Sequence, residues 1–143
     1  MAISLPGSSM PASDSSPVVD GLTTVPSHFG TKETMDRLEA EIRGNGMEVF
    51  ARIDHAAGAV KAGLPLAPTE LIIFGNARGG TPLMQSVQTV GIDLPLKALV
   101  WEDASGKTWL SYEEQSWIAQ RHGIYNAQAV LNKMADLLTT IST

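Results

Sequence analysis

The stretch P-T-E-L-I-I-F-G-N-A-R-G-G-T-P-L-M-Q-S-V-Q-T-V-G-I-D-L-P-L-K-A-L-V-W-E-D, residues 68–103, places apolar runs around one glycine-rich loop. Residues 71–74 are apolar without alternation, which predicts a central strand covered on both faces or one end of a β-layer under helices. After the loop, Thr81 can cap a helix whose first position is Pro82, where a missing amide costs nothing. A second apolar strand is predicted over residues 94–102. The loop therefore marks a sharp turn from strand to helix.

The flanking sequence extends this order in both directions. The other predicted elements are a strand over 18–26, a helix over 31–43, a strand over 47–54, a short helix over 55–63, a strand over 107–112, a helix closed by Gly123 and an amphipathic helix from Asn126. Ser111 with Glu114 offers a capping box for the helix that ends at Gly123. This order indicates an α+β fold, a two-layer sandwich in which a mainly antiparallel sheet is backed by helices.

The segment from Asn126 has the clearest helical periodicity of the chain. Its apolar side chains fall on one side of the predicted helix, at Val130, Leu131, Met134, Leu137, Leu138 and Ile141. We therefore expect this helix to pack on the sheet and Leu137 to be buried.

Length, composition and charge limit the class of protein. The 143 residues fit one domain over residues 18–143, which follows a Ser/Pro-rich tail over residues 1–17. The tail lacks the features of a signal peptide, and no membrane span is predicted. A net charge of −5 disfavours nucleic-acid binding. The absence of cysteine excludes disulfides and thiolate metal sites but leaves the compartment open, with the cytoplasm favoured and the periplasm as the alternative.

The loop after the central strand has the residue types of an anion site. Glycine permits close backbone approach, Arg78 can fork onto a carboxylate or phosphate, and a helix start at Thr81 directs free amides and a partial positive charge toward the loop. The alternative is that a strand turning into a helix needs glycine in any case, with Arg78 merely solvated. The candidate ligand-binding residues are Gly75, Asn76, Arg78, Gly79, Gly80, Thr81 and His55.

His55 follows Asp54 at the end of a predicted strand, and we expect it near the same edge of the sheet as the loop. The two side chains could act as a proton-transfer pair or as metal ligands. Neighbours on a strand point to opposite faces, so a capping role for Asp54 and a structural hydrogen bond for His55 are favoured. With no cysteine and no H-x-x-x-H spacing, a metal site is disfavoured.

Trp101 and Trp109 fall on the same face of the predicted sheet as Lys97 and Ser111. Two aromatic side chains on one face can form a ligand platform, a dimer surface or ordinary core, and core together with interface is the favoured interpretation. With the small size of the chain, this pair predicts a symmetric homodimer.

Several short motifs carry a resemblance to a known family. They are R-I-D-H at 52–55 with A-A-G-A-V after it, P-T-E-L-I-I-F-G-N at 68–76, G-T-P-L-M at 80–84, D-L-P-L-K at 93–97, V-W-E-D at 100–103 and W-L-S-Y at 109–112. With these motifs the chain resembles the bacterial and archaeal family called domain of unknown function 302. The resemblance implies a fold like that of the TATA-box-binding protein and a homodimer. It implies no DNA binding, because fold does not carry function and this chain is acidic. The family usually has proline where this chain has Ala77.

Three classes of function follow from these observations. The favoured class is a small, soluble homodimeric protein that binds a small anionic ligand at the loop. The first alternative is an enzyme that uses His55 with Arg78, which requires both side chains in one pocket. The second alternative is a structural or interaction module whose loop holds no ligand. The sequence identifies neither the ligand nor a cofactor.

Overall fold

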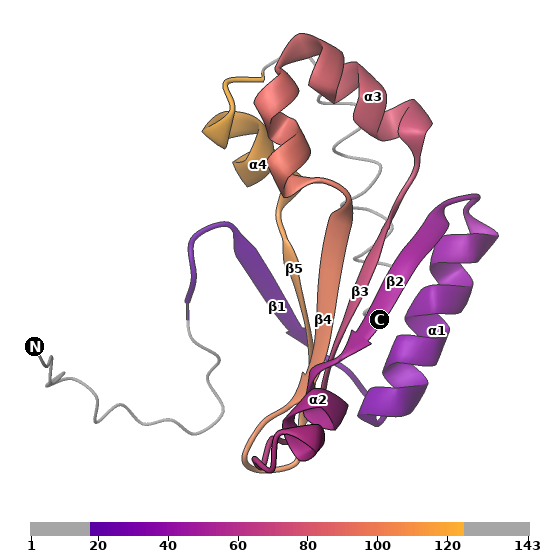
Figure 1. The fold of residues 1–143 in the computed structure, drawn as a ribbon, viewed down its shortest axis with the longest axis vertical. Coiled ribbons are helices and arrows are strands. Elements are labelled where there is room, and N and C mark those ends of the chain that lie inside the picture. The colour runs from indigo at the N-terminus through magenta and orange to yellow at the C-terminus, as the bar shows by residue number, and fades with distance from the viewer. Residues whose placement is uncertain (1–17, 125–143) are drawn as a thin grey trace, which may run out of the picture.

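Five strands form one antiparallel sheet in the order β1-β5-β4-β3-β2 (Figure 1). The structure is a computed structural model, and it describes residues 18–124. The strands are β1 (Leu22–Pro26), β2 (Glu48–Asp54), β3 (Thr69–Gly75), β4 (Leu96–Glu102) and β5 (Thr108–Glu113). The apolar run 71–74 lies in β3, inside the sheet between β2 and β4, as the sequence predicts.

The helices lie along the sheet and at its two ends. In the described part of the chain they are α1 (Thr31–Gly44), α2 (His55–Lys61), α3 (Ala77–Ser86), the 3₁₀ helix η2 (Gln88–Asp93) and α4 (Gln115–Arg121). Helix α1 contacts β2, β3 and β4. Helix α2 lies at one end of the sheet, whereas α3 and α4 lie at the opposite end, at the bottom and top of Figure 1. This arrangement confirms the predicted α+β fold with an antiparallel sheet backed by helices.

The main apolar core lies between α1 and the sheet. Met35, Leu38 and Ile42 recur at helical spacing, so they share one face of α1, and all three are fully buried. Ile72 and Phe74 meet them from β3, where residues two apart point to the same side of a strand. Burial of each of these side chains stabilises the fold by roughly 1.5–3 kcal/mol. This apolar contact is therefore the main interaction that holds α1 on the sheet.

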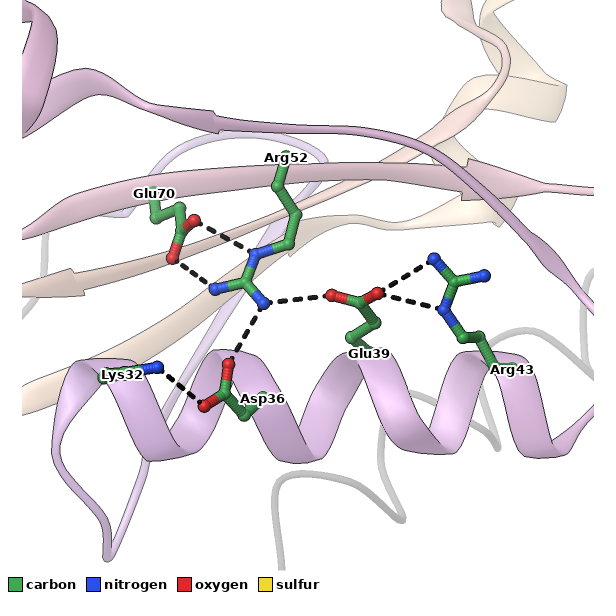
Figure 2. Close-up of polar contacts among 6 residues, drawn as sticks. All are labelled: Lys32, Asp36, Glu39, Arg43, Arg52 and Glu70. Atoms are coloured by element: carbon green, nitrogen blue, oxygen red, sulfur yellow. Dashed lines mark hydrogen bonds and ion pairs between the residues drawn. The ribbon is translucent and has the colours of Figure 1, made fainter.

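A charged cluster joins α1 to the sheet beside this core, as Figure 2 shows. Arg52 of β2 donates two hydrogen bonds to Glu70 of β3, from Nε at 3.0 Å and from Nη2 at 2.9 Å. Its Nη1 donates to Asp36 at 3.0 Å and to Glu39 at 2.9 Å, both on α1. These bonds from Arg52 hold the pKa of both α1 carboxyls below their ordinary values. We call these four residues the Arg52 cluster, and it links α1 to two strands.

A second apolar cluster lies at the α3–α4 end of the sheet. Its buried members are Leu83, Val90, Ile118, Ala119 and Ile124. Beside it, Asp93 at the end of η2 is 7% exposed. Its carboxylate accepts hydrogen bonds at 3.0 Å from Nη1 of Arg121, and Nε2 of His122 lies 2.6 Å from Oδ2. These polar contacts tether η2 to α4, so the cluster is closed on one side by ion pairing.

The helix after β3 begins at Ala77, whereas the sequence predicts a start at Thr81. Asn76 is the N-cap, and its Oδ1 accepts a hydrogen bond from the amide of Gly79 at 2.7 Å. Pro82 therefore lies inside α3 rather than at its first position. A side-chain cap is worth about 1 kcal/mol, which offsets the similar cost of one helical glycine. The expected glycine-rich loop is thus mostly the first turn of a helix.

Ser111 does not cap a helix, contrary to the sequence prediction. It lies in β5 and is 4% exposed. Its Oγ lies 2.8 Å from Oγ1 of Thr24 and accepts a hydrogen bond from Nε1 of Trp101 at 2.9 Å. Helix α4 follows Glu114, whose carboxylate accepts from the hydroxyl of Thr23 and makes no capping bond. The capping box fails because β5 continues past Ser111.

Two sequence predictions concern residues outside the described range 18–124. These are the Ser/Pro-rich tail over residues 1–17 and the amphipathic helix from Asn126, with the burial of Leu137. A single domain over residues 18–143 likewise stays a prediction.

Candidate functional site

A pocket of about 270 Å³ lies at the end of the sheet where α3 and α4 are found. This end of the sheet is at the top of Figure 1. Its walls come from the β3–α3 turn, from α3, from the segment between η2 and β4, and from the start of α4. The apolar side chains that line it are Phe50, Leu83, Met84, Leu94, Pro95, Leu96 and Ile118. The pocket is therefore mainly apolar, with its polar groups gathered where α3 and α4 begin.

Most of the sequence-predicted loop residues meet at this pocket. The predicted residues that line it are Gly75, Asn76, Gly79, Gly80 and Thr81, joined by Ala77. Gly75 ends β3 with φ of +156°, a backbone conformation that other residues rarely adopt. The glycine at this position thus serves the turn that carries the chain from β3 into α3.

The hydrogen bonds of the α3 start differ from those expected of an anion site. The amides of Gly79 and Gly80 already donate to Asn76, to Oδ1 at 2.7 Å and to the backbone oxygen at 3.0 Å, so an anion cannot use them as the sequence predicts. The amides of Ala77 and Arg78 come before them, and neither has an acceptor within residues 18–124. With the helix dipole, these two amides give this rim of the pocket a partial positive charge.

Arg78 lies on the first turn of α3 but outside the pocket. Its side chain is exposed, and it is not among the lining residues. A forked contact with a ligand inside the pocket is therefore not built into this structure. An exposed guanidinium near the rim still contributes long-range attraction for anions.

His55 lies at the opposite end of the sheet from the pocket. It is the first residue of α2 and is exposed. Strands β2 and β3 are antiparallel, with Asp54 opposite Glu70 and Glu48 opposite Gly75. At about 3.3 Å per residue, His55 and the pocket end of β3 are roughly 20 Å apart. The expectation that His55 lies near the loop is therefore wrong, and the enzyme that pairs it with Arg78 lacks the required geometry.

Asp54 has the local role that the sequence analysis favours. It is the N-cap of α2, and its Oδ1 accepts a hydrogen bond from the amide of Ala57 at 2.9 Å. In the described part of the chain, no group of three or more His, Cys, Asp or Glu side chains is arranged to hold a metal ion.

Gln115 is a pocket residue that the sequence analysis does not identify. It is the first residue of α4, is 5% exposed and lines the pocket. Its Nε2 donates to the backbone oxygen of Glu113 at 3.0 Å, whereas its Oε1 has no hydrogen-bond partner among the described residues. Glutamines in binding sites have no characteristic spacing in a sequence. The hydrogen-bond partner of Gln115 is a backbone oxygen whose position depends on where β5 ends and α4 begins. No sequence signal could have marked this residue.

The two tryptophans form a pair on the sheet face opposite α1. Trp101 and Trp109 are register partners on β4 and β5, with ring centroids 6.2 Å apart. Both indole N–H groups are bonded, that of Trp101 to Ser111 and that of Trp109 to Oδ2 of Asp103 at 2.9 Å. The bond from Trp109, with others from the turn, holds the pKa of Asp103 well below its ordinary value. The pair is thus fixed within the β4–β5 hairpin.

The chain belongs to the family described as domain of unknown function DUF302, whose family model matches residues 23–141. This match confirms the resemblance carried by the sequence motifs. A solved structure, the crystal structure of the uncharacterized conserved protein DUF302 from Bacillus stearothermophilus, is similar with a TM-score of 0.76 at 18% sequence identity. The similarity covers 87% of this chain and 97% of that chain, and it supports the fold described above.

Curated relatives carry a different description. The protein described as fluoride-specific ion channel FluC 1 of Brucella suis biovar 1 (strain 1330) is 55% identical over 104 residues, which are 73% of this chain and 41% of the relative. Fluoride-specific ion channel FluC 1 of Brucella abortus biovar 1 (strain 9-941) is also 55% identical over 104 residues, 38% of its length. The chain thus spans about two fifths of these relatives. Among the helices within residues 18–124, none has the length and apolar character needed to cross a membrane.

Proposed function

We propose that this domain binds a small molecule with an apolar body and one anionic group, in the pocket between α3 and α4. The observation that carries the proposal is the coincidence of two features in one pocket. These are the mainly apolar walls and the first amides of α3, which have no acceptor within residues 18–124. A ligand with an apolar body and an anionic group accounts for both.

The walls and size of the pocket favour a small ligand. Pockets for drug-sized molecules span about 300–1,000 Å³, and 270 Å³ lies just below that range. Met84, Leu94 and Ile118 offer apolar surface, and burial of a ligand against it is favourable by about 25 cal/mol per Å². An aromatic or short aliphatic body fits this description.

The start of α3 favours an anionic group on that ligand. The amides of Ala77 and Arg78 lack acceptors within the described residues, and a helix N-terminus attracts negative charge. The exposed guanidinium of Arg78 adds a second positive charge nearby. A carboxylate is the group we expect at this rim.

Benzoate is the probe that tests the proposal. We expect backbone amide shifts in a benzoate titration to centre on residues 75–84 and on the start of α4, and inorganic sulfate to bind more weakly because it lacks an apolar body. Gly80→Leu should abolish the shifts, since a Cβ at Gly80 already lies 3.7 Å from Cδ1 of Leu94 and 3.8 Å from Cε of Met84. Shifts confined to other regions would count against the pocket.

The matched control is Gly58→Leu in α2. This change also replaces a helical glycine with leucine, but a Cβ at Gly58 has no heavy atom within 4 Å. Benzoate binding should survive it. Arg78→Ala should weaken benzoate binding by no more than about 1 kcal/mol, because an exposed charge is screened by solvent, and Arg78→Lys should bind like the unchanged protein.

A second candidate function is an accessory role beside a fluoride channel. The observation that favours it is the 55% identity over 104 residues with proteins described as fluoride-specific ion channels. The chain spans about two fifths of those proteins, so their activity belongs to this domain only as a proposal. An amide-shift titration with sodium fluoride distinguishes this role from the binding of a benzoate-like ligand. Saturable shifts at Ala77 and Arg78 at low millimolar fluoride, absent with chloride, would favour this role over benzoate-like ligands.

We also propose that the domain is a homodimer, as the family resemblance implies. An edge strand supports this, since β2 borders the sheet and its Phe50 and Ile53 are 50% and 39% exposed. A symmetric contact along β2 would cover both side chains. Light scattering at micromolar concentrations should give twice the mass of one chain, and a monomer mass throughout would reject the dimer.

A further inference from the structure

Phe50 is the only aromatic side chain among the described residues that line the pocket. The other apolar walls come from aliphatic side chains and from Met84. Phe50 is 50% exposed, so half of its surface is open to contact in the structure as it stands. It is therefore the side chain that can distinguish an aromatic ligand body from an aliphatic one.

A β-bulge positions Phe50 at the pocket. Val49 lies opposite Phe74, and the next pair in register is Ala51 with Ile73. Phe50 is therefore the extra residue of the bulge. Bulges are common at sheet edges and beside functional sites, where they redirect a side chain from the direction that a regular strand gives it. Strand β2 is an edge strand, and its bulged residue lines the pocket.

Phe50 also lies near the rim where the anionic group is expected. Glu48 is opposite Gly75, the last residue of β3, and α3 begins two residues later at Ala77. At about 3.3 Å per residue, Phe50 is roughly 7 Å along β2 from Glu48. A small ligand whose carboxylate meets the first amides of α3 thus has its body within reach of Phe50.

We infer that the apolar body of the ligand is an aromatic ring that packs against Phe50. The inference rests on the proposed function, and it chooses between the aromatic and aliphatic bodies that the pocket admits. Aromatic rings attract each other in offset-stacked or edge-to-face contacts, beyond the effect of buried area alone. The sulfur of Met84 also makes favourable contacts with aromatic rings. The ligand class is thus a small aromatic carboxylate.

Benzoate and cyclohexanecarboxylate form a matched pair of probes. Both have a carboxylate on a six-membered ring, but only benzoate is aromatic. Amide-shift titrations of the full chain give both dissociation constants, and their ratio measures the preference for the aromatic ring. We expect the unchanged protein to prefer benzoate, and Phe50→Leu to reduce this preference by about two- to tenfold. Phe50→Tyr keeps an aromatic ring and should retain the preference.

The matched control is Phe29→Leu. Phe29 is 36% exposed, has the guanidinium carbon of Arg37 3.9 Å from its ring centre, and is not among the residues that line the pocket. The preference for benzoate should survive this change. The dimer proposed along β2 would bring a second copy close to Phe50, so all variants are compared in one oligomeric state, established by light scattering.

Intermolecular NOEs provide a second measurement on the unchanged protein, which does not depend on how a variant folds. We expect NOEs between the ring protons of bound benzoate and those of Phe50.

The outcomes separate the two proposals. Benzoate that binds at residues 75–84 with the same preference in Phe50→Leu overturns this inference and leaves the proposed function standing. Binding there without NOEs to Phe50 also overturns the inference alone. If neither carboxylate binds in the pocket, the proposed function and the inference fail together.

Discussion

Two strand-to-helix junctions of this domain share their local chemistry and differ in their surroundings. At one end of the sheet, Asp54 is the last residue of β2, and its side chain accepts a hydrogen bond from the amide of Ala57 at 2.9 Å. At the other end, Asn76 follows β3 and accepts from the amide of Gly79 at 2.7 Å. Helix α2, after Asp54, has no buried residue, whereas α3 buries Leu83 in the second apolar cluster.

The difference teaches what a cap does and what it does not do. In both junctions a short polar side chain satisfies an amide of the first helical turn, which determines where the helix begins. Only α3 has a second wall opposite it, supplied by η2 and α4 and held by the contacts of Asp93 with Arg121 and His122. The pocket is therefore a product of packing between distant segments rather than of the turn itself.

Truncation of a buried side chain of α4, in the wall opposite α3, should have the largest effect on stability. Ile118 of α4 is 3% exposed and belongs to the second apolar cluster, so Ile118→Ala should lower the free energy of unfolding by about 2–5 kcal/mol. Val60 of α2 is 73% exposed, and Val60→Ala should change the free energy of unfolding by less than about 0.5 kcal/mol. Urea denaturation of both variants measures the contrast. Equal losses would mean that the two ends of the sheet are packed alike.

Removing each cap should have a smaller and nearly equal effect. Asn76→Ala and Asp54→Ala each lose one side-chain bond to a helical amide, which costs about 1 kcal/mol. Amide spectra should tell them apart, because only Asn76→Ala removes the side-chain acceptor of the Gly79 amide beside the pocket. Unchanged resonances for residues 77–84 in Asn76→Ala would show that the cap does not hold the pocket rim.

Acidification should produce the smallest effect, through the Arg52 cluster. The folded-state pKa values of Asp36 and Glu39 lie below their ordinary values of 3.8 and 4.5, mainly because of hydrogen bonds from Arg52. A lowered pKa stabilises the fold above the ordinary pKa, and this contribution is lost as pH falls through the folded-state pKa. Stability should therefore decline below about pH 4.5.

Arg52→Met is the variant that isolates this contribution. Its stability should decline less steeply than that of the unchanged protein as pH falls from 5 to 3, since the carboxyls then titrate near their ordinary pKa values. Exposed ion pairs are weak, so the change in slope should be small and should shrink in high salt. Denaturation midpoints across this pH range provide the measurement, and identical slopes would exclude a role for Arg52.

The sequence predicts the fold well where burial dominates. The apolar run 71–74 and the helical spacing of Met35, Leu38 and Ile42 mark β3 and α1 because these side chains form the main core. The prediction of the α3 start is wrong because two adjacent glycines indicate a loop on propensity alone. The Asn76 cap and the burial of Leu83, which depends on η2 and α4, override that propensity.

The candidate site could be predicted only in part for the same reason. The loop residues around Gly75 lie close in sequence, so they reach the pocket together. The expected position of His55 is wrong because a sequence pattern does not reveal which strand ends share an edge, and the antiparallel register of β2 with β3 moves His55 away. The location of Gln115 at the pocket depends on where β5 ends and on how α3 packs against α4. A sequence pattern reveals neither of these.

The order of strands in the sheet also sets the order in which the chain can fold. Strands β2 to β5 follow one another as neighbours, so their pairing closes short loops. Strand β1 instead joins β5 across most of the chain, and Thr23 bonds to Glu114 at a separation of 91 residues. Closing so long a loop costs more entropy, and distant pairings form slowly. We therefore expect β1 to join last in folding and to exchange its amide hydrogens first.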